Sequence, residues 1–119
     1  MSPPTLLICL GLHTSTLAGI RREGAFCVNI LAAGRQDLAE RFAGRGGFQG
    51  ADRFGLGDWS PLVTGAPALT DALAAIDCRL EEIIERHTHA ILIGAAQAVR
   101  VPGVDGALLH WRSQFETLP

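Results

Sequence analysis

Apolar positions that recur at every second residue give the clearest structural signal in the chain. Phe26, Val28 and Ile30 share one face of an extended segment, residues 25–31. Residues 90–101 open with a fully apolar stretch that Gly94 closes, which is typical of a buried strand. Residues 5–10 are apolar and follow two prolines, so they also favour a strand. The pattern therefore predicts three strands.

Two short segments between these strands carry helical spacing instead. The hydroxyl-rich residues 13–16 can cap a helix that runs to about Glu23 and ends at Gly24, with its apolar positions on one side. Residues 36–43 have Leu38 and Phe42 spaced to point the same way, which predicts a second helix.

Residues 44–67 are irregular and rich in glycine, and they contain Phe48, Phe54 and Trp59. A loop of this length in a small domain usually covers a site or an interface. Its aromatic residues indicate packing onto another part of the protein.

Residues 69–86 fit two structures. Leu73, Ile76, Leu80 and Ile83 recur at three and four positions, which favours a helix. Ile76, Cys78 and Leu80 also alternate with Asp77, Arg79 and Glu81, which suits a half-solvated strand. The local pattern favours the helix.

The C-terminal part begins with turn sequences at residues 102–103 and 105–106. Residues 107–115 are then predicted to return as the hairpin partner of the strand at residues 90–101, with Leu109 and Trp111 on one face.

Composition limits the class of protein. The 119 residues fit one domain, and 48% of them are hydrophobic. A net charge of -2 without a basic stripe argues against nucleic acid as a ligand. No apolar run is long enough for a membrane span. The N-terminus lacks the basic residues that begin a secretory signal, so such a signal is not expected. Three cysteines inside apolar segments predict free thiols and a cytoplasmic location.

His89 is the most prominent candidate for chemistry, because it opens the apolar run of residues 89–94. An imidazole at the edge of a pocket can carry a proton or hold a negative group near neutral pH. It can equally be a strand-end histidine bonded to a neighbouring carbonyl. His87 lies two residues away, but no acidic or cysteine partner is near, so no metal site is predicted. No phosphate-binding glycine motif or nucleophile elbow is present.

An ordered series of short motifs runs through nearly the whole chain. The motifs are Pro3-Pro4-x4-Cys9-Leu10, Phe26-Cys27-Val28-Asn29-Ile30-Leu31, Arg41-Phe42-Ala43-Gly44, Asp52-Arg53-Phe54, Trp59, Gly65-Ala66-Pro67-x-Leu69, Thr88-His89-x4-Gly94 and Leu108-Leu109-His110-Trp111. This series resembles the flavin reductase family, the NAD(P)H:flavin oxidoreductases that supply reduced flavin to two-component monooxygenases. The reductase component of 4-hydroxyphenylacetate and phenol hydroxylases is the most similar type.

The resemblance implies a mainly β fold with short helices, the FMN-binding split β-barrel, with residues 1–119 as one domain. It implies a homodimer, FMN or FAD as the flavin, NADH or NADPH as co-substrate, and a monooxygenase as partner. It also makes residues 73–84 a barrel strand, against their local helix propensity. Relatives carry opening strands and a flavin-binding segment before the diproline, so this chain is expected to be truncated at its N-terminus.

The resemblance also assigns site residues. Gly11, His13, Thr14 and Ser15 fall in the loop that contacts the flavin ribityl chain and phosphate, where hydroxyls at a helix start suit an anion. A plain helix cap is the alternative reading of Thr14 and Ser15. Relatives often have Asn in place of Gly11 and His13.

The remaining assigned residues lie further along the chain. Phe26 and Asn29 edge the flavin site in relatives, although Phe26 also suits a core position. Arg53 is a phosphate partner or a solvated loop charge. His89 falls beside the nicotinamide, and Phe115 packs near the same site or serves as a C-terminal core aromatic. A non-catalytic flavin- or haem-binding module and an inactive remnant are the alternative functions.

Overall fold

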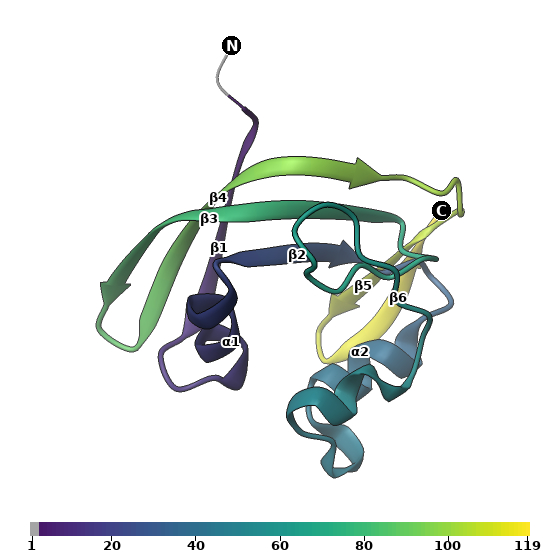
Figure 1. Ribbon diagram of the computed structural model, residues 1–119. Helices are drawn as coiled ribbons and strands as arrows, with labels where there is room; N and C mark the ends of the chain where they lie inside the picture. Colours follow the sequence, from purple (N-terminus) through teal and green to yellow (C-terminus); the bar gives the residue numbers. More distant parts are fainter. Residues whose placement is uncertain (1–2) are drawn as a thin grey trace.

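A curled four-stranded antiparallel sheet forms the centre of the protein (Figure 1). The computed structural model describes residues 3–119. The strands lie in the order β1-β4-β3-β2 and comprise β1 (Thr5–Gly11), β2 (Ala25–Ile30), β3 (Ala74–Arg86) and β4 (His89–Arg100). The three strands predicted from alternation and apolar runs are therefore confirmed, and the mainly β fold is confirmed with them.

The helices are short, as the sequence predicts. Helix α1 (Ser15–Glu23) begins at Thr14, whose hydroxyl accepts a hydrogen bond from the Leu17 amide at 3.2 Å, and it ends at Gly24 in the left-handed conformation. Helix α2 (Gln36–Phe42) follows β2, and two 3₁₀ turns, η1 (Arg45–Gly47) and η2 (Gly50–Gly55), follow it. Within residues 3–119, no helix is long and apolar enough to cross a membrane.

Residues 74–86 form a strand, which confirms the strand that the resemblance implies for residues 73–84 and shows that the helix favoured by the local pattern is wrong. Strand β3 is hydrogen-bonded on both sides, to β2 and to β4. The pairing with β4 extends over residues 75–86 and the pairing with β2 over residues 74–79, and together they outweigh helix propensity. The alternation over residues 76–81 predicted Asp77 on a solvated face, and this too is wrong because Asp77 is fully buried.

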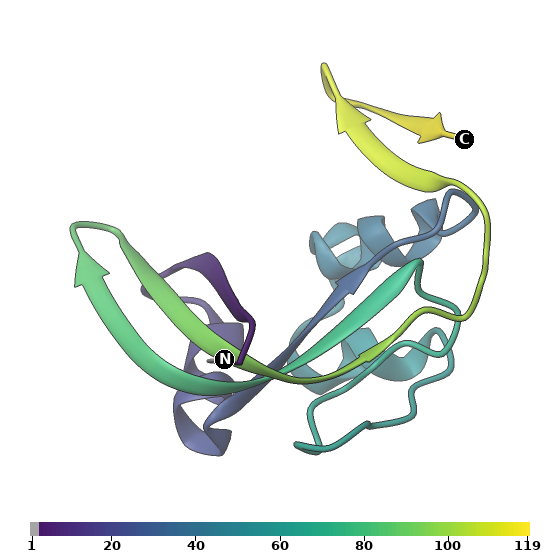
Figure 2. The ribbon, with the colours of Figure 1, turned by 90° about the horizontal axis from the view of Figure 1, so that it is seen from above.

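The C-terminal hairpin also differs from its prediction. Strand β5 (Ala107–Trp111) pairs with β6 (Gln114–Leu118) and not with β4. Gly103 and Gly106 have positive φ angles, and they turn the chain away from β4. The hairpin is attached instead beyond β2, where the Leu108 amide donates to the Leu31 carbonyl at 3.1 Å. Figure 2 shows this hairpin standing apart from the main sheet.

Two apolar clusters cover the two faces of the sheet, because alternate residues of each strand point to opposite sides. The first cluster joins α1 to the sheet through Leu17, Ile20, Phe26, Cys78, Ala90 and Leu92. The second joins α2 and residues 56–72 to the sheet through Leu38, Ala68, Leu69, Ala72 and Ala75. The neighbours Phe26 and Cys27 of β2 pack against different clusters.

Candidate functional site

A cavity of about 880 Å³ lies between α1, β2, α2, η2 and the loop around residues 59–67. Ligand-binding cavities of proteins commonly have volumes of this size. A second hollow of about 650 Å³ adjoins it and shares Ser15, Phe42, Gly50 and Arg53 as lining residues. The two hollows are therefore continuous along these shared residues.

Three aromatic side chains form one wall of the cavity. Phe42 of α2, Phe54 of η2 and Trp59 have ring centroids 5.0 to 5.7 Å apart, in edge-on or tilted orientations. The Trp59 indole nitrogen donates to the Leu56 carbonyl at 2.9 Å, which fixes the ring. The aromatic residues of the long loop were predicted to pack onto another part of the protein, and Phe54 and Trp59 do so by packing against Phe42 of α2. They give the cavity a rigid, apolar surface suited to a flat ring.

Arg53 brings a positive charge to the start of α1. Its guanidinium lies 3.3 Å from the Ser15 hydroxyl and 3.5 Å from the Thr16 hydroxyl, and its Nε donates to the Gly50 carbonyl at 3.1 Å. A helix N-terminus carries partial positive charge, and α1 has no acidic residue in its first turn. An anion placed here would interact favourably with both positive groups.

A loop with closely spaced ends forms another wall of the cavity. We call residues 60–69 the strap, because the Ser60 amide donates to the Ala68 carbonyl at 2.8 Å and closes the loop at its base. Residues 64–67 of the strap line the cavity. Loops of this kind are compact and frequently functional.

Four of the residues predicted to bind flavin line the cavity: Ser15, Phe26, Asn29 and Arg53. Phe26 is only 4% exposed and belongs to the first apolar cluster, so it has a core role as well. The Asn29 side chain is already bonded to the strap, since its oxygen accepts from the Leu69 amide at 2.8 Å and its nitrogen donates to the Pro67 carbonyl at 3.1 Å.

The other predicted residues near α1 lie at the adjacent end of the sheet. Gly11 of β1 pairs directly with His89 of β4, and the Leu12 amide donates to the Thr88 carbonyl at 3.0 Å. His89 is exposed, and its Nδ1 lies 2.9 Å from the Thr88 hydroxyl. Neither His89 nor Gly11 is among the residues that line the two hollows.

His13 and Thr14 connect these two regions. His13 is exposed in the turn between β1 and α1, and Thr14 is the helix cap. The cap reading of Thr14 is therefore confirmed, and Ser15 follows it as the first helical residue. The turn between β1 and α1 thus begins at Gly11, which pairs with His89, and ends at Ser15, which lines the cavity.

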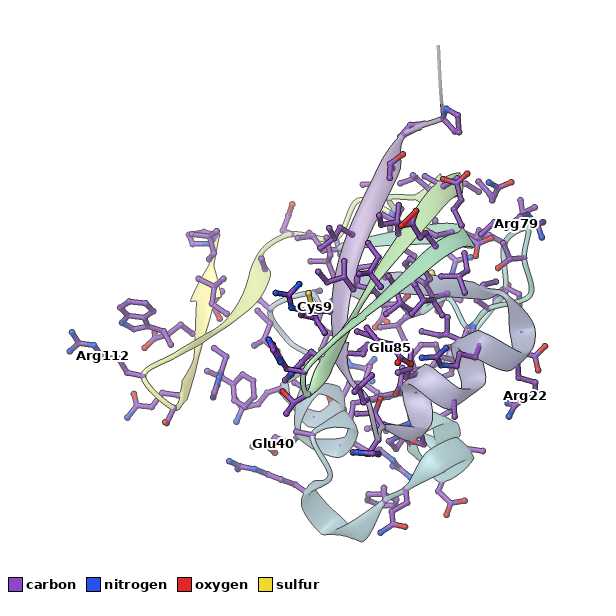
Figure 3. All side chains as sticks on the ribbon, turned by 90° about the vertical axis from the view of Figure 1, so that its left-hand side faces the viewer. Cys9, Arg22, Glu40, Arg79, Glu85 and Arg112 are labelled. Atoms are coloured by element: carbon purple, nitrogen blue, oxygen red, sulfur yellow. The ribbon has the colours of Figure 1, made fainter. Side chains whose placement is uncertain are left out.

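Phe115 lies apart from both groups. It belongs to β6, and its ring is 5.0 Å from the His110 ring within the same hairpin. It does not line either hollow. Figure 3 shows Arg112 at the tip of this hairpin, projecting away from the sheet.

The sequence did not reveal several residues that shape the cavity. Asp77 accepts hydrogen bonds from the strap, and Cys27 lines the cavity on the same face of the sheet. Burial raises the pKa of the Cys27 thiol to about 11, and the charge of Asp77 adds to this effect. The two-residue period that placed Phe26 on one face also places Cys27 and Asn29 on the other. Within residues 3–119, no cluster of three His, Cys, Asp or Glu side chains could hold a metal ion.

Known proteins share this architecture. An FMN reductase (NADH) RutF from Methylorubrum populi is 43% identical over 99% of this chain, which spans 57% of that protein's length. A Haemophilus somnus 129PT protein assigned as a flavin reductase has a TM-score of 0.91 at 30% identity, covering 98% of this chain and 73% of its own. BorF, the flavin reductase component of a bacterial two-component tryptophan halogenase, has a TM-score of 0.87 at 29% identity, covering 98% of this chain and 74% of its own.

The family model of the flavin reductase like domain matches residues 1–119. The match extends over the strands, the cavity and the strap described above. The chain belongs to the flavin reductase like domain family.

Proposed function

We propose that this chain is an NAD(P)H:flavin oxidoreductase domain that supplies reduced FMN or FAD to a partner monooxygenase. The observation that carries the proposal is the cavity, in which Arg53 and the start of α1 make an anion site beside an aromatic wall. The membership of the flavin reductase like domain family adds to it. A flavin nucleotide combines the two features that this cavity offers, a flat ring and a phosphate.

The residues present fit a flavin. Phe42, Phe54 and Trp59 offer apolar surface for its ring, while Arg53 and the Ser15 hydroxyl would hold its phosphate. The bound flavin would supply a ring that accepts a hydride from the nicotinamide cofactor. The protein would hold that ring in place and exclude water from it, which raises the rate by orientation.

Arg53 provides the sharpest test of the flavin site. Replacing it with methionine keeps the length of the side chain and removes the charge, so we expect FMN affinity to fall by about ten- to a hundredfold, the range for a charge-assisted hydrogen bond. Affinity for riboflavin, which has no phosphate, should change little. Arg45→Met is the matched control, because Arg45 is an exposed arginine that does not line the large cavity.

The measurements are flavin titration by fluorescence and NADH oxidation with and without FMN. Equal loss of FMN and riboflavin binding in Arg53→Met would show that the phosphate does not lie at α1. Tight flavin binding without NADH oxidation would assign the chain to the non-catalytic flavin-binding modules. Absence of flavin-stimulated NADH oxidation and of flavin binding would refute the proposal.

His89 is our proposed residue for the nicotinamide. Its place at the end of the turn that leads to Ser15 supports a co-substrate site beside the flavin phosphate site. His89→Ala should raise the KM for NADH and leave FMN affinity unchanged, as measured by steady-state kinetics and flavin titration. His87→Asn is the control, because His87 is exposed in the adjacent turn at a positive φ that Asn tolerates. Parallel loss of NADH use and FMN binding would contradict the role.

We also infer a homodimer. Leu7 of β1 is 60% exposed and Ile84 of β3 is 41% exposed. They lie on one face of the sheet with Ile91 and Ile93, because Leu7 pairs with Ile93 and Ile84 pairs with Ile91. Exposed apolar surface of this kind marks interfaces. Sedimentation should give a dimer that Ile84→Glu dissociates, and a wild-type monomer would refute the inference.

The cellular context is inferred in the same way. The free Cys9, Cys27 and Cys78 suit a reducing compartment, which supports the cytoplasm as the location. A monooxygenase that consumes reduced flavin is the partner we propose. Stimulation of such an oxygenase by this protein, NADH and FMN would test the pairing.

A further inference from the structure

Three polar side chains from adjacent strands hold the strap against the sheet. Asp77 of β3 accepts from the amides of Val63 and Thr64, both at 2.8 Å, and from the Thr64 hydroxyl at 2.5 Å. Asn29 of β2 bonds to Pro67 and Leu69, as described above. Arg100 of β4 donates to the carbonyls of Ser60 and Ala68 at 3.1 and 3.0 Å.

These side chains share one face of the sheet because of the strand register. Asn29 and Arg100 are both paired with Ala75 on β3, one on each side. Asp77 lies two residues further along β3, and residues two apart on a strand point to the same face. The strap therefore lies on a row of polar groups that three strands supply together.

Asp77 makes three of these hydrogen bonds, more than Asn29 or Arg100. It is fully buried, with an exposure of 0%, and it does not line the cavity. Thr64, to which it is bonded twice, does line the cavity, and so do the three residues that follow. The Thr64 hydroxyl in turn accepts from the Ala66 amide at 3.2 Å, so the bonds of Asp77 extend into the wall.

We propose that Asp77 is a positioning residue: it fixes the wall of the cavity formed by Thr64–Pro67, and through that wall it raises the affinity for flavin without lining the cavity itself. This inference rests on the proposed function for the identity of the ligand. A buried carboxylate bonded only to strap atoms confers order on the strap. A ligand that packs against a wall ordered beforehand loses less free energy to the ordering of that wall on binding.

Asp77→Leu tests the proposal. Leucine has a similar size but no acceptor atom, so the bonds from the Val63 amide, the Thr64 amide and the Thr64 hydroxyl are all lost. We expect the Kd for FMN to rise at least tenfold and the KM for flavin to rise with it, while kcat at saturating flavin stays close to the wild-type value. Amide hydrogen exchange at Val63 and Thr64 should accelerate, while amides in the centre of β4 stay protected.

Leu92→Ala is the control for a general loss of stability. Leu92 is fully buried in the first apolar cluster and does not line the cavity. Its truncation should lower the melting temperature, keep the Kd for FMN within twofold, and leave Val63 and Thr64 protected at a temperature where the variant is folded. Arg100→Met is a second variant that releases Ser60 and Ala68, and we expect it to weaken FMN binding several-fold.

The outcomes separate this inference from the proposed function. If the wild-type protein binds FMN and Asp77→Leu binds it equally well, the positioning role is wrong. If Asp77→Leu does not fold, Arg100→Met with unaltered FMN affinity overturns the inference and weakened affinity supports it. If the wild-type protein binds no flavin, the proposed function fails. Hydrogen exchange then decides alone: faster exchange confined to the strap supports the positioning role, and unchanged exchange overturns it.

Discussion

The two faces of the sheet are closed in different ways. On one face, α1 packs its apolar side against all four strands, and the contact consists of the first apolar cluster. On the other face, α2 and the strap cover the sheet, and the buried Asp77 and the half-buried Asn29 share the contact with small apolar side chains. Figure 1 shows the two helices beneath different parts of the sheet.

This difference explains how the strap can form a wall of the cavity. Apolar side chains of a helix interdigitate with a sheet and leave few voids. A loop has backbone amides and carbonyls that must be satisfied, and polar side chains from the sheet can do this only by holding the loop at defined points. Between those points the loop stands off the sheet. The polar anchors therefore shape the strap wall of the cavity, while α1 and Phe26 of the first cluster line its other side.

Truncation of one leucine on each face should give the largest effects. Leu92→Ala should lower the free energy of unfolding by about 3–5 kcal/mol, because the helix and sheet around it cannot collapse into the space. Leu38→Ala should cost about 2–3 kcal/mol, because Leu38 lines a cavity whose loop walls can relax. Urea unfolding measures both values.

Flavin affinity separates the two variants further. Leu38→Ala should weaken FMN binding, whereas Leu92→Ala should not. A larger loss of stability for Leu38→Ala than for Leu92→Ala would contradict the expectation that the loop walls around Leu38 relax more easily than the helix and sheet around Leu92.

Cys9 and Cys27 should differ in reactivity because they differ in burial. The pKa of Cys27 is raised from 9.0 to about 11, chiefly by burial, so its thiolate fraction at pH 8 is about a hundredfold below that of an ordinary thiol. Cys9 is exposed and should react first with iodoacetamide. The rate for Cys27 should keep rising until about pH 11, since a raised pKa keeps the thiol neutral to higher pH. Mass spectrometry of labelled peptides measures both rates, and equal rates at pH 8 would contradict the assignment.

Gly94 tests the packing of the first face. A Cβ at this position would lie 2.5 Å from Cζ of Phe26 and 3.0 Å from Cβ of Cys78. We expect Gly94→Ala to cost about 1–3 kcal/mol in unfolding free energy, because both neighbours are buried in the first cluster. Gly34→Ala is the control, since a Cβ there meets no atom within 4 Å. A cost for Gly94→Ala as small as that of the control would show that the Phe26 ring moves freely.

Much of the fold could be predicted from the sequence, because short-range rules decide it. The cap at Thr14 and the glycine at position 24 set the limits of α1, and the alternation of Phe26 and Val28 gave β2. Strand β3 could not be assigned locally, since its helix-like spacing is overruled by partners far away in the sequence. The resemblance to the flavin reductase family supplied those partners.

The site was less predictable. Ser15 and Arg53 were named as phosphate residues, and they do lie together, although their role in flavin binding stays a prediction. Asp77 escaped notice because an aspartate that alternates with apolar residues indicates a solvated face. Its burial depends on a strap 13 and 14 residues earlier in the sequence, and no local pattern encodes that contact.

The ion pair between Arg21 of α1 and Glu85 of β3 should give the smallest effect. Their side chains are 44% and 58% exposed, and Figure 3 shows Glu85 beside α1 at the surface. A double-mutant cycle with Arg21→Ala and Glu85→Ala should give a coupling of about 0.5 kcal/mol that decreases in high salt. Asp77 has no access to water, so its bonds to the strap should resist salt. A coupling between Arg21 and Glu85 above about 2 kcal/mol would mean that charge, and not apolar packing alone, secures α1 to the sheet.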